Sequence, residues 1–313
     1  MFARFFLIFA FIFSALWADF KLNLSANVSA LKLSNDELFI GLDNGELYKY
    51  NLKSTLDFLK AKQNINPKTL LATTPKISNF FETNINAKIY GIDEYNGLLA
   101  LLIEGDNGSK NLGILKQNSK LKIINLPLDN VKKIIILDEN TIVLLSFSSE
   151  IYYFDLKSQK SVFSTKLSTS SFGDASFDRA QNTLALGCEG GVIFLFNTAS
   201  KTLLSMVEAQ KDSIYSLSLE NSRLLSGSAD KQAYYFDGLR VHYFDTKFLV
   251  YATALSQKYG AYSLENGINI IDKNASIIKK LNYDGASLNY LFFYDEILIG
   301  AGYDNFVQFW ELK

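Results

Sequence analysis

A serine and a carboxylate stand four residues apart in the run Ser226-Gly-Ser-Ala-Asp230, a pattern that suggests a serine nucleophile with an acidic group behind it. Such a nucleophile needs a base, and His242 is the only histidine in the chain. The same frame recurs at residues 186–190 and 300–304, where no serine occupies the position of Ser226. Because a catalytic serine occurs once whereas a structural turn recurs, we interpret the stretch as a turn.

Possible metal ligands are equally sparse. The two acidic loops, residues 43–46 and 105–108, contain oxygen ligands but not the spacing of a calcium-binding loop, so they are interpreted as turns. One histidine and one cysteine, Cys188, do not make a typical zinc or copper set. A single cysteine also excludes an intramolecular disulfide and a thiol–disulfide relay.

A turn of this kind, preceded by an apolar strand and followed by an alternating one, occurs seven times. The last aromatic or apolar residue of each unit is Tyr50, Leu115, Phe154, Phe196, Phe236, Ile271 or Trp310. The intervals between them are 65, 39, 42, 40, 35 and 39 residues. Apart from the first, these intervals lie near the roughly 40 to 45 residues of a four-stranded propeller blade.

The repeat predicts an all-β fold, a single seven-bladed β-propeller over residues 19–313. A third, inner strand precedes each hairpin, and a fourth is visible at residues 241–244 after Asp237-Gly238. Only three residues follow Trp310, so the last blade lacks an outer strand of its own. Residues 19–24 alternate apolar and polar, and we expect them to close the ring by pairing with the last blade.

The long first interval contains a segment, about residues 52–86, that is longer than an ordinary connection between two blades. It is expected to hold one irregular outer strand and an insertion of roughly 20 residues. Two interpretations stay open, a functional loop and a decorated connection.

The first 18 residues have the pattern of a cleaved secretory signal peptide, with Arg4 before an apolar run and Ala18 at the cleavage point. This predicts export to the bacterial periplasm, and no second apolar segment of that length follows, so no membrane span is expected in the mature chain. The chain has 31 basic and 32 acidic residues, which argues against nucleic-acid binding. A monomer is expected.

The turns at residues 226–237 and 300–311 resemble the blade motif of the WD40 family, with Phe236-Asp237 and Trp310-Glu311 in the place of its closing Trp-Asp pair. The family's Gly-His pair is missing throughout. Length, the leader segment, degenerate blades and scarce Cys and His also make the chain similar to the NapL accessory proteins of periplasmic nitrate reductase systems. That resemblance implies a non-catalytic role in nitrate respiration, in the maturation, stability or electron supply of a molybdenum-containing nitrate reductase, with no cofactor.

The sequence therefore favours a protein-binding scaffold and not an enzyme. Propellers without a catalytic set present loop rims as binding surfaces, where exposed aromatic residues are the usual anchors. The candidate partner-binding residues near blade connections are Phe80, Phe81, Phe172, Tyr215, Tyr283 and Tyr303. Two alternatives stay open, a propeller hydrolase or lactonase that uses calcium bound by channel carboxylates, and an outer-membrane assembly scaffold.

Overall fold

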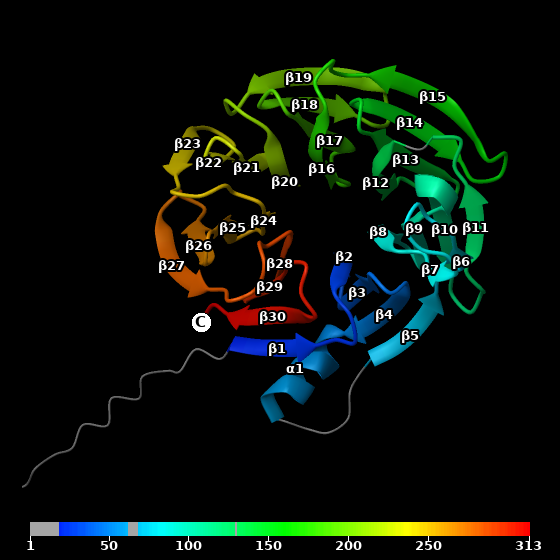
Figure 1. Cartoon of the computed structure of the whole chain (residues 1–313). Helices are drawn as coiled ribbons and strands as arrows, with labels where there is room; N and C mark the ends of the chain where they lie inside the picture. The colour runs from blue at the N-terminus through cyan, green and yellow to red at the C-terminus, as the bar shows by residue number, and fades with distance from the viewer. Residues whose placement is uncertain (1–18, 62–67, 129) are drawn as a thin grey trace, which may run out of the picture.

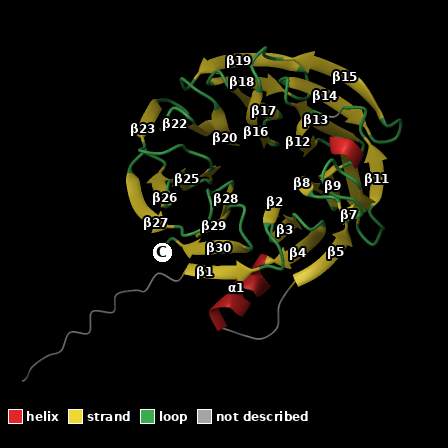
Figure 2. Ribbon diagram, in the orientation of Figure 1, coloured by secondary structure: helices red, strands yellow, loops and turns green. Residues whose placement is uncertain are grey.

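The computed structural model describes residues 19–61, 68–128 and 130–313. The predicted signal peptide, residues 1–18, lies outside the described residues. Seven four-stranded antiparallel sheets stand around a central axis, so the fold is the predicted seven-bladed β-propeller (Figure 1). Figure 2, which draws strands in yellow and helices in red, shows that strands make up nearly all of its regular structure.

The strands of each blade run from an inner strand at the axis to an outer strand at the rim. Blade 1 consists of β2 (Val28–Ser34), β3 (Glu37–Leu42), β4 (Glu46–Asn51) and β5 (Lys68–Thr73). Blade 2 consists of β8 (Ile89–Tyr95), β9 (Leu98–Glu104), β10 (Lys110–Lys116) and β11 (Lys122–Asn125). Blade 3 consists of β12 (Val131–Ile136), β13 (Thr141–Ser146), β14 (Glu150–Asp155) and β15 (Lys160–Lys166).

The remaining blades follow the same order. Blade 4 consists of β16 (Phe172–Asp178), β17 (Thr183–Cys188), β18 (Val192–Asn197) and β19 (Thr202–Glu208). Blade 5 consists of β20 (Ile214–Glu220), β21 (Arg223–Ser228), β22 (Gln232–Phe236) and β23 (Val241–Asp245). Blade 6 consists of β24 (Thr253–Leu255), β25 (Tyr259–Leu264), β26 (Gly267–Asp272) and β27 (Ile277–Asn282).

Blade 7 joins the two ends of the chain. Its strands are β28 (Tyr290–Tyr294), β29 (Ile297–Ala301), β30 (Phe306–Glu311) and, outermost, β1 (Asp19–Asn23). β1 pairs antiparallel with β30, from Asp19 opposite Trp310 to Asn23 opposite Phe306. The predicted closure by the N-terminal strand is thus confirmed, and Figure 1 shows the blue and red strands side by side.

The run Ser226–Asp230 includes the end of β21 and the turn that joins β21 to β22. The Asp230 carboxylate accepts hydrogen bonds from the backbone N–H groups of Gln232 (3.0 Å) and Lys211 (2.8 Å). Lys231 has a left-handed backbone with φ of 64°, and Gly191 has a φ of 76° in the corresponding turn of blade 4. A glycine such as Gly191 adopts this conformation without strain, whereas most side chains, including that of Lys231, resist it.

The segment at residues 52–86 contains the expected outer strand, β5, together with a helix and a short hairpin. It begins with α1 (Leu52–Ala61), an α-helix between β4 and β5, for which Asn51 accepts a capping hydrogen bond from the Ser54 N–H (3.1 Å). Leu52 and Leu56 are buried in the core around β1 and β4. β5 is a regular outer strand with one register shift, and a short hairpin of β6 (Lys76–Ile77) and β7 (Ile85–Asn86) follows it.

Candidate functional site

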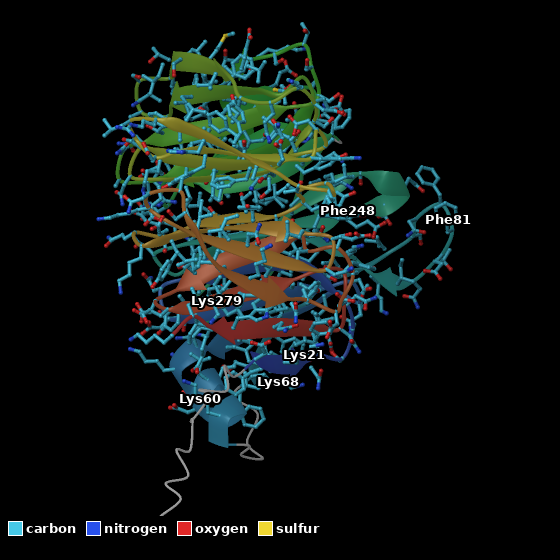
Figure 3. All side chains as sticks on the ribbon, turned by 90° about the vertical axis from the view of Figure 1, so that its left-hand side faces the viewer. Lys21, Lys60, Lys68, Phe81, Phe248 and Lys279 are labelled. Atoms are coloured by element: carbon cyan, nitrogen blue, oxygen red, sulfur yellow. The ribbon has the colours of Figure 1, made fainter. Side chains whose placement is uncertain are left out.

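The two faces of the disc carry different turns. Because all blades are antiparallel, the chain between one blade and the next lies on the same face as the turn between the second and third strands. We call this side the connection face, and the turns between first and second and between third and fourth strands lie on the opposite face. In the edge-on view of Figure 3, Phe81 and Phe248, which both belong to blade connections, project toward the same side.

Four of the six predicted contact residues are exposed on the connection face. Phe80 and Phe81 lie at the tip of the β6–β7 hairpin with 75% and 93% of their surface exposed. Tyr215 is the second residue of β20, and Tyr303 lies in the turn between β29 and β30. The structure therefore places these four residues on one side of the disc.

Phe172 and Tyr283 do not belong to this surface, since only 7% and 3% of their side chains are exposed. Phe172 packs in the core between blades 3 and 4. The Tyr283 hydroxyl donates to the Asp304 carboxylate (2.6 Å) and accepts the Gly302 N–H (2.9 Å). Burial and this hydrogen bond raise the pKa of Tyr283 well above its usual value. Both residues stabilise blade packing, which corrects their prediction as partner contacts.

The hairpin tip that carries Phe81 is held by a local network. The Asn79 side-chain oxygen accepts the backbone N–H groups of Phe81 (3.0 Å) and Glu82 (2.9 Å), and the Asn79 N–H donates to the Glu82 carbonyl (2.9 Å). Such an Asx-type turn fixes the backbone without burying the side chains on it. Phe81 is thus exposed on an ordered turn.

A single 3₁₀ turn, η1 (Asp106–Gly108), anchors the hairpin to blade 2. The Asp106 carboxylate accepts the Ser78 N–H (2.8 Å), and the Asn107 N–H donates to the Ser78 carbonyl (3.0 Å). The Phe80 ring lies against Gly108, where an added Cβ would come within 3.2 Å of the ring. The acidic loop at residues 105–108 therefore positions the hairpin.

Tyr303 connects the last blade to the first. Its hydroxyl donates to Asp43 Oδ2 (2.7 Å), whose carboxylate also accepts the Asn27 side-chain amide (3.0 Å). This hydrogen bond to a carboxylate raises the pKa of Tyr303 above its usual value. The acidic loop at residues 43–46 is therefore engaged in joining blades.

The mouth of the central channel on this face is ringed by residues at β-bulges. In blades 1 to 5, the register of the inner strand shifts at its second residue: Ser29, Tyr90, Lys132, Gly173 and Tyr215. Bulges re-aim side chains, which here leave the sheet surface near the mouth. Tyr251 holds the corresponding place in blade 6, because Val250 packs on Gly227 as Ile214 packs on Gly187.

Tyr251 and its neighbour Phe248 were missed at the sequence level. The Tyr251 ring stacks on Tyr215 with centroids 5.0 Å apart and meets the Phe248 ring edge to face at 6.1 Å. The available signal was a buried β-branched residue followed by tyrosine at or just before three of the inner strands: Ile89-Tyr90, Ile214-Tyr215 and Val250-Tyr251.

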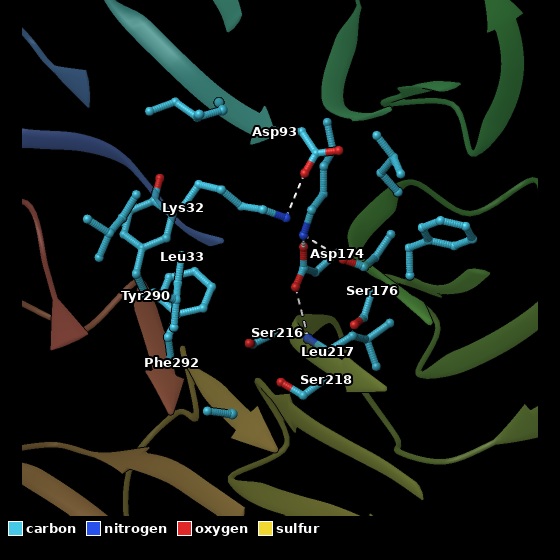
Figure 4. A pocket seen from close by; sticks show the side chains of 18 of the residues that line it. Lys32, Leu33, Asp93, Asp174, Ser176, Ser216, Leu217, Ser218, Tyr290 and Phe292 are labelled. Atoms are coloured by element: carbon cyan, nitrogen blue, oxygen red, sulfur yellow. Dashed lines mark hydrogen bonds and ion pairs between the residues drawn. The ribbon is translucent and has the colours of Figure 1, made fainter. Parts of the chain in front are cut away.

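The inner strands enclose a central cavity of about 810 Å³ that holds two ion pairs (Figure 4). Lys32 Nζ lies 2.6 Å from Asp93 Oδ1, and Lys133 Nζ lies 2.6 Å from Asp174 Oδ1. The other oxygen of each aspartate accepts a backbone N–H from the next blade, Ile136 (2.7 Å) for Asp93 and Leu217 (2.9 Å) for Asp174. These carboxylates therefore join neighbouring blades.

The residues considered for nucleophilic chemistry are likewise engaged elsewhere. Ser226 is buried in β21 and its hydroxyl donates to Gln210 Oε1 (2.8 Å). His242 lies on the outer strand β23, and its Nε2 is 3.0 Å from Asp237 Oδ2. The structure does not bring Ser226 and His242 together as a nucleophile and base.

Neither a metal site nor a membrane span stands out in the part of the chain that the structure describes. Within residues 19–61, 68–128 and 130–313, no three His, Cys, Asp or Glu side chains gather as a metal site. The helices of these ranges are too short or too polar to cross a membrane. Burial raises the pKa of the Cys188 thiol, which is consistent with a packing role.

Comparison with known proteins shows similarity in fold. No protein-family model and no curated protein matches the chain. A chain in the crystal structure of the mitotic checkpoint complex superposes with a TM-score of 0.73 at 15% identity, over 93% of this chain and 90% of that one. The computationally designed Ika8 protein superposes with a TM-score of 0.63 at 12% identity, over 92% and 97%. At these identities the likeness shows the WD40-like propeller fold alone.

Proposed function

We propose that the protein is a non-catalytic scaffold that binds another protein through its connection face. The observation that carries this proposal is Phe81, a large apolar side chain that is 93% exposed on a turn fixed by hydrogen bonds. Exposed aromatic side chains on an ordered support lose little conformational entropy on binding and are frequent binding hot spots.

The hairpin adds a second ring to the same anchor. Phe80 is 75% exposed and rests on Gly108, so the two phenylalanines form an apolar projection from an anchored loop. A partner with an apolar pocket would remove both rings from water, at about 25 cal/mol per Å² of apolar area. Tyr303 and Tyr215, on the same face, extend the contact surface toward the channel mouth.

The narrower form of the proposal concerns the partner and the compartment. The leader-like first 18 residues support export to the periplasm, and the resemblance to the NapL accessory proteins supports a periplasmic nitrate reductase system as the partner. In that setting the scaffold would assist maturation, stability or electron supply of the reductase without holding a cofactor. The propeller fold is compatible with this role.

The test is affinity capture of tagged protein from the periplasm, with mass spectrometry of the captured proteins. A Phe80→Ser/Phe81→Ser variant is compared with Leu239→Ser, because Leu239 is 90% exposed in the β22–β23 turn of the opposite face. We expect nitrate reductase subunits with the wild type and with Leu239→Ser, and at least tenfold less with the double variant.

The outcomes separate the two levels of the proposal. Equal capture of the subunits by all three proteins would show that the connection face is not the binding surface. Absence of the subunits from every capture would refute the nitrate reductase assignment. A different protein that the wild type and Leu239→Ser retain and the double variant loses would support the scaffold and its face with another partner.

A further inference from the structure

Three tyrosines occupy equivalent positions at the mouth of the channel. Tyr90 and Tyr215 are the second residues of β8 and β20, each at a register shift, and Tyr251 follows the buried Val250 in blade 6. Their equivalence allows the surroundings of one ring to be compared with those of the others.

Tyr90, the blade 2 member of this set, already has lysine side chains near its ring. Lys110 Nζ lies 4.0 Å from the centre of the Tyr90 ring, and Lys88 Nζ lies 5.9 Å from it. Other exposed rings of the connection face have the same partner type, since Lys88 lies 4.4 Å from the Tyr303 ring and Lys132 lies 5.2 Å from Phe147. A cation at such a distance is attracted by the negative face of the ring.

The cluster of Tyr215, Tyr251 and Phe248 differs. It is held by stacking of the two tyrosines (5.0 Å, 23° between planes) and by the edge contact of Phe248. Within the described residues, no lysine or arginine lies over any of its three rings. Tyr215 is nevertheless exposed, so part of its ring remains open to a group from outside.

The neighbouring blade contributes no side chain beside Tyr215. The equivalent residue of blade 4 is Gly173, whose added Cβ would lie 2.0 Å from the Ile214 carbonyl oxygen. Close approach of the two inner strands therefore excludes any side chain at this position, and blade 4 contributes no residue like Lys132 at the mouth.

Charge on this part of the face favours a cation. The connections and turns of blades 4 to 6 (residues 189–191, 209–213, 229–231, 246–252, 265–266 and 283–289) hold five carboxylates and three lysines. The carboxylates belong to Glu189, Asp212, Asp230, Glu265 and Asp284. A positively charged group meets a modest excess of negative charge as it approaches the cluster.

We propose that the Tyr215–Tyr251–Phe248 cluster receives a cationic side chain, an arginine guanidinium, from a partner protein. The molecule contains an internal example of this contact, because the Arg179 guanidinium lies 3.7 Å from the centre of the Tyr95 ring. A guanidinium is planar and weakly hydrated, so it stacks on an aromatic ring more readily than an ammonium group. This inference rests on the proposed scaffold function and names the chemistry that the partner presents.

The test uses the purified full-length mature chain and three small probes: N-acetyl-arginine-N-methylamide, its lysine counterpart, and the neutral isostere N-acetyl-citrulline-N-methylamide. Binding is followed by NMR of ring-labelled tyrosines, with Tyr215 and Tyr251 assigned from single Tyr→Phe variants. We expect a saturable shift of these two resonances with the arginine probe. The citrulline probe should bind about two- to thirtyfold more weakly, and Tyr90 should shift less because Lys110 lies over its ring.

A Tyr251→Leu variant should lose most of the arginine response, whereas Tyr243→Leu, an exposed tyrosine on the outer strand β23, should retain it. Equal binding of the arginine and citrulline probes to the wild type would overturn the proposal without any variant. Tighter binding of the lysine probe would overturn the choice of a guanidinium. The titration does not depend on capture of a partner. A negative titration would therefore refute arginine binding by the cluster, whereas the proposed scaffold function is tested separately by the capture experiment.

Discussion

The central channel and the connection face differ in whether their polar and aromatic side chains are already engaged in contacts within the protein. In the channel, the carboxylates of Asp93 and Asp174 each contact a lysine and a backbone N–H of a neighbouring blade. On the connection face, Phe81 and Tyr215 are exposed, and the half-buried Tyr251 stacks on Tyr215. The residues that resemble catalytic groups are thus used in the architecture, and the aromatic residues are available to a partner.

This difference predicts different consequences of mutation. A change in the channel removes contacts between blades and lowers the free energy of unfolding. A change on the connection face removes a group that contacts few atoms of its own chain and lowers binding instead.

Deletion of residues 19–26 removes β1, and with it the pairing to β30 and the buried side chain of Leu22. Because β30 then becomes an open edge and the core that blades 1 and 7 share loses Leu22, we expect a loss of unfolding free energy on the order of 5 kcal/mol. Thermal melts should show a decrease in Tm of roughly 10 °C or more, or no cooperative transition. A Tm equal to that of an Asn23→Ser control, an exposed position of β1, would contradict closure by this strand.

Asp93→Ala tests the channel alone. The substitution leaves the Lys32 ammonium and the Ile136 N–H without their carboxylate, and we expect a loss of about 2–4 kcal/mol in urea unfolding. Asp93→Asn keeps an acceptor for the N–H and should lose less. If Asp93→Ala were as stable as Glu265→Ala, an exposed control, the channel pairs would not hold the blades together.

Phe81→Ser tests the connection face. Since the side chain is almost fully exposed, we expect a change in unfolding free energy within about 0.5 kcal/mol, as for Leu239→Ser on the opposite face. Urea unfolding with unchanged m-values measures this, while the capture experiment measures binding. A large loss of stability in Phe81→Ser would mean that the ring serves the fold, which would remove the main support for the proposed function.

The sequence predicted the fold because each blade repeats a turn and a strand pattern, and it predicted the closure because the last blade lacked an outer strand. It did not predict α1, although Asn51 caps it and Leu52 and Leu56 share one helix face. The propeller period directed attention to strands, and a ten-residue helix inside one long interval does not change that period.

Site residues were harder to predict because neighbouring positions of one strand face opposite ways. Phe172 and Ile214 begin their inner strands and are buried, whereas Tyr215, one residue later, is at a bulge and exposed. A shift of one residue exchanges the two faces of a strand, and a bulge changes the pattern again. Proximity to a blade connection was therefore insufficient to separate Phe172 and Tyr283 from the exposed candidates.

The smallest expected effect is on the pH dependence of stability and concerns Asp237, on the face opposite the connection face. Both oxygens of its carboxylate have partners within the protein, as in the channel carboxylates. The Arg240 N–H, the His242 ring and the Leu239 N–H hydrogen bond to it and lower its pKa to about 2. A carboxylate with a lowered folded-state pKa stabilises the fold above its unfolded pKa, near 3.8, and this contribution is lost as the pH falls toward 2. Asp237→Asn should therefore flatten the acid limb of the stability profile between pH 4 and 2, relative to the wild type, as measured by urea unfolding at each pH. An unchanged acid limb in Asp237→Asn would mean that this turn, although hydrogen-bonded, contributes no pH-dependent stability, and the comparison would then hold for the channel alone.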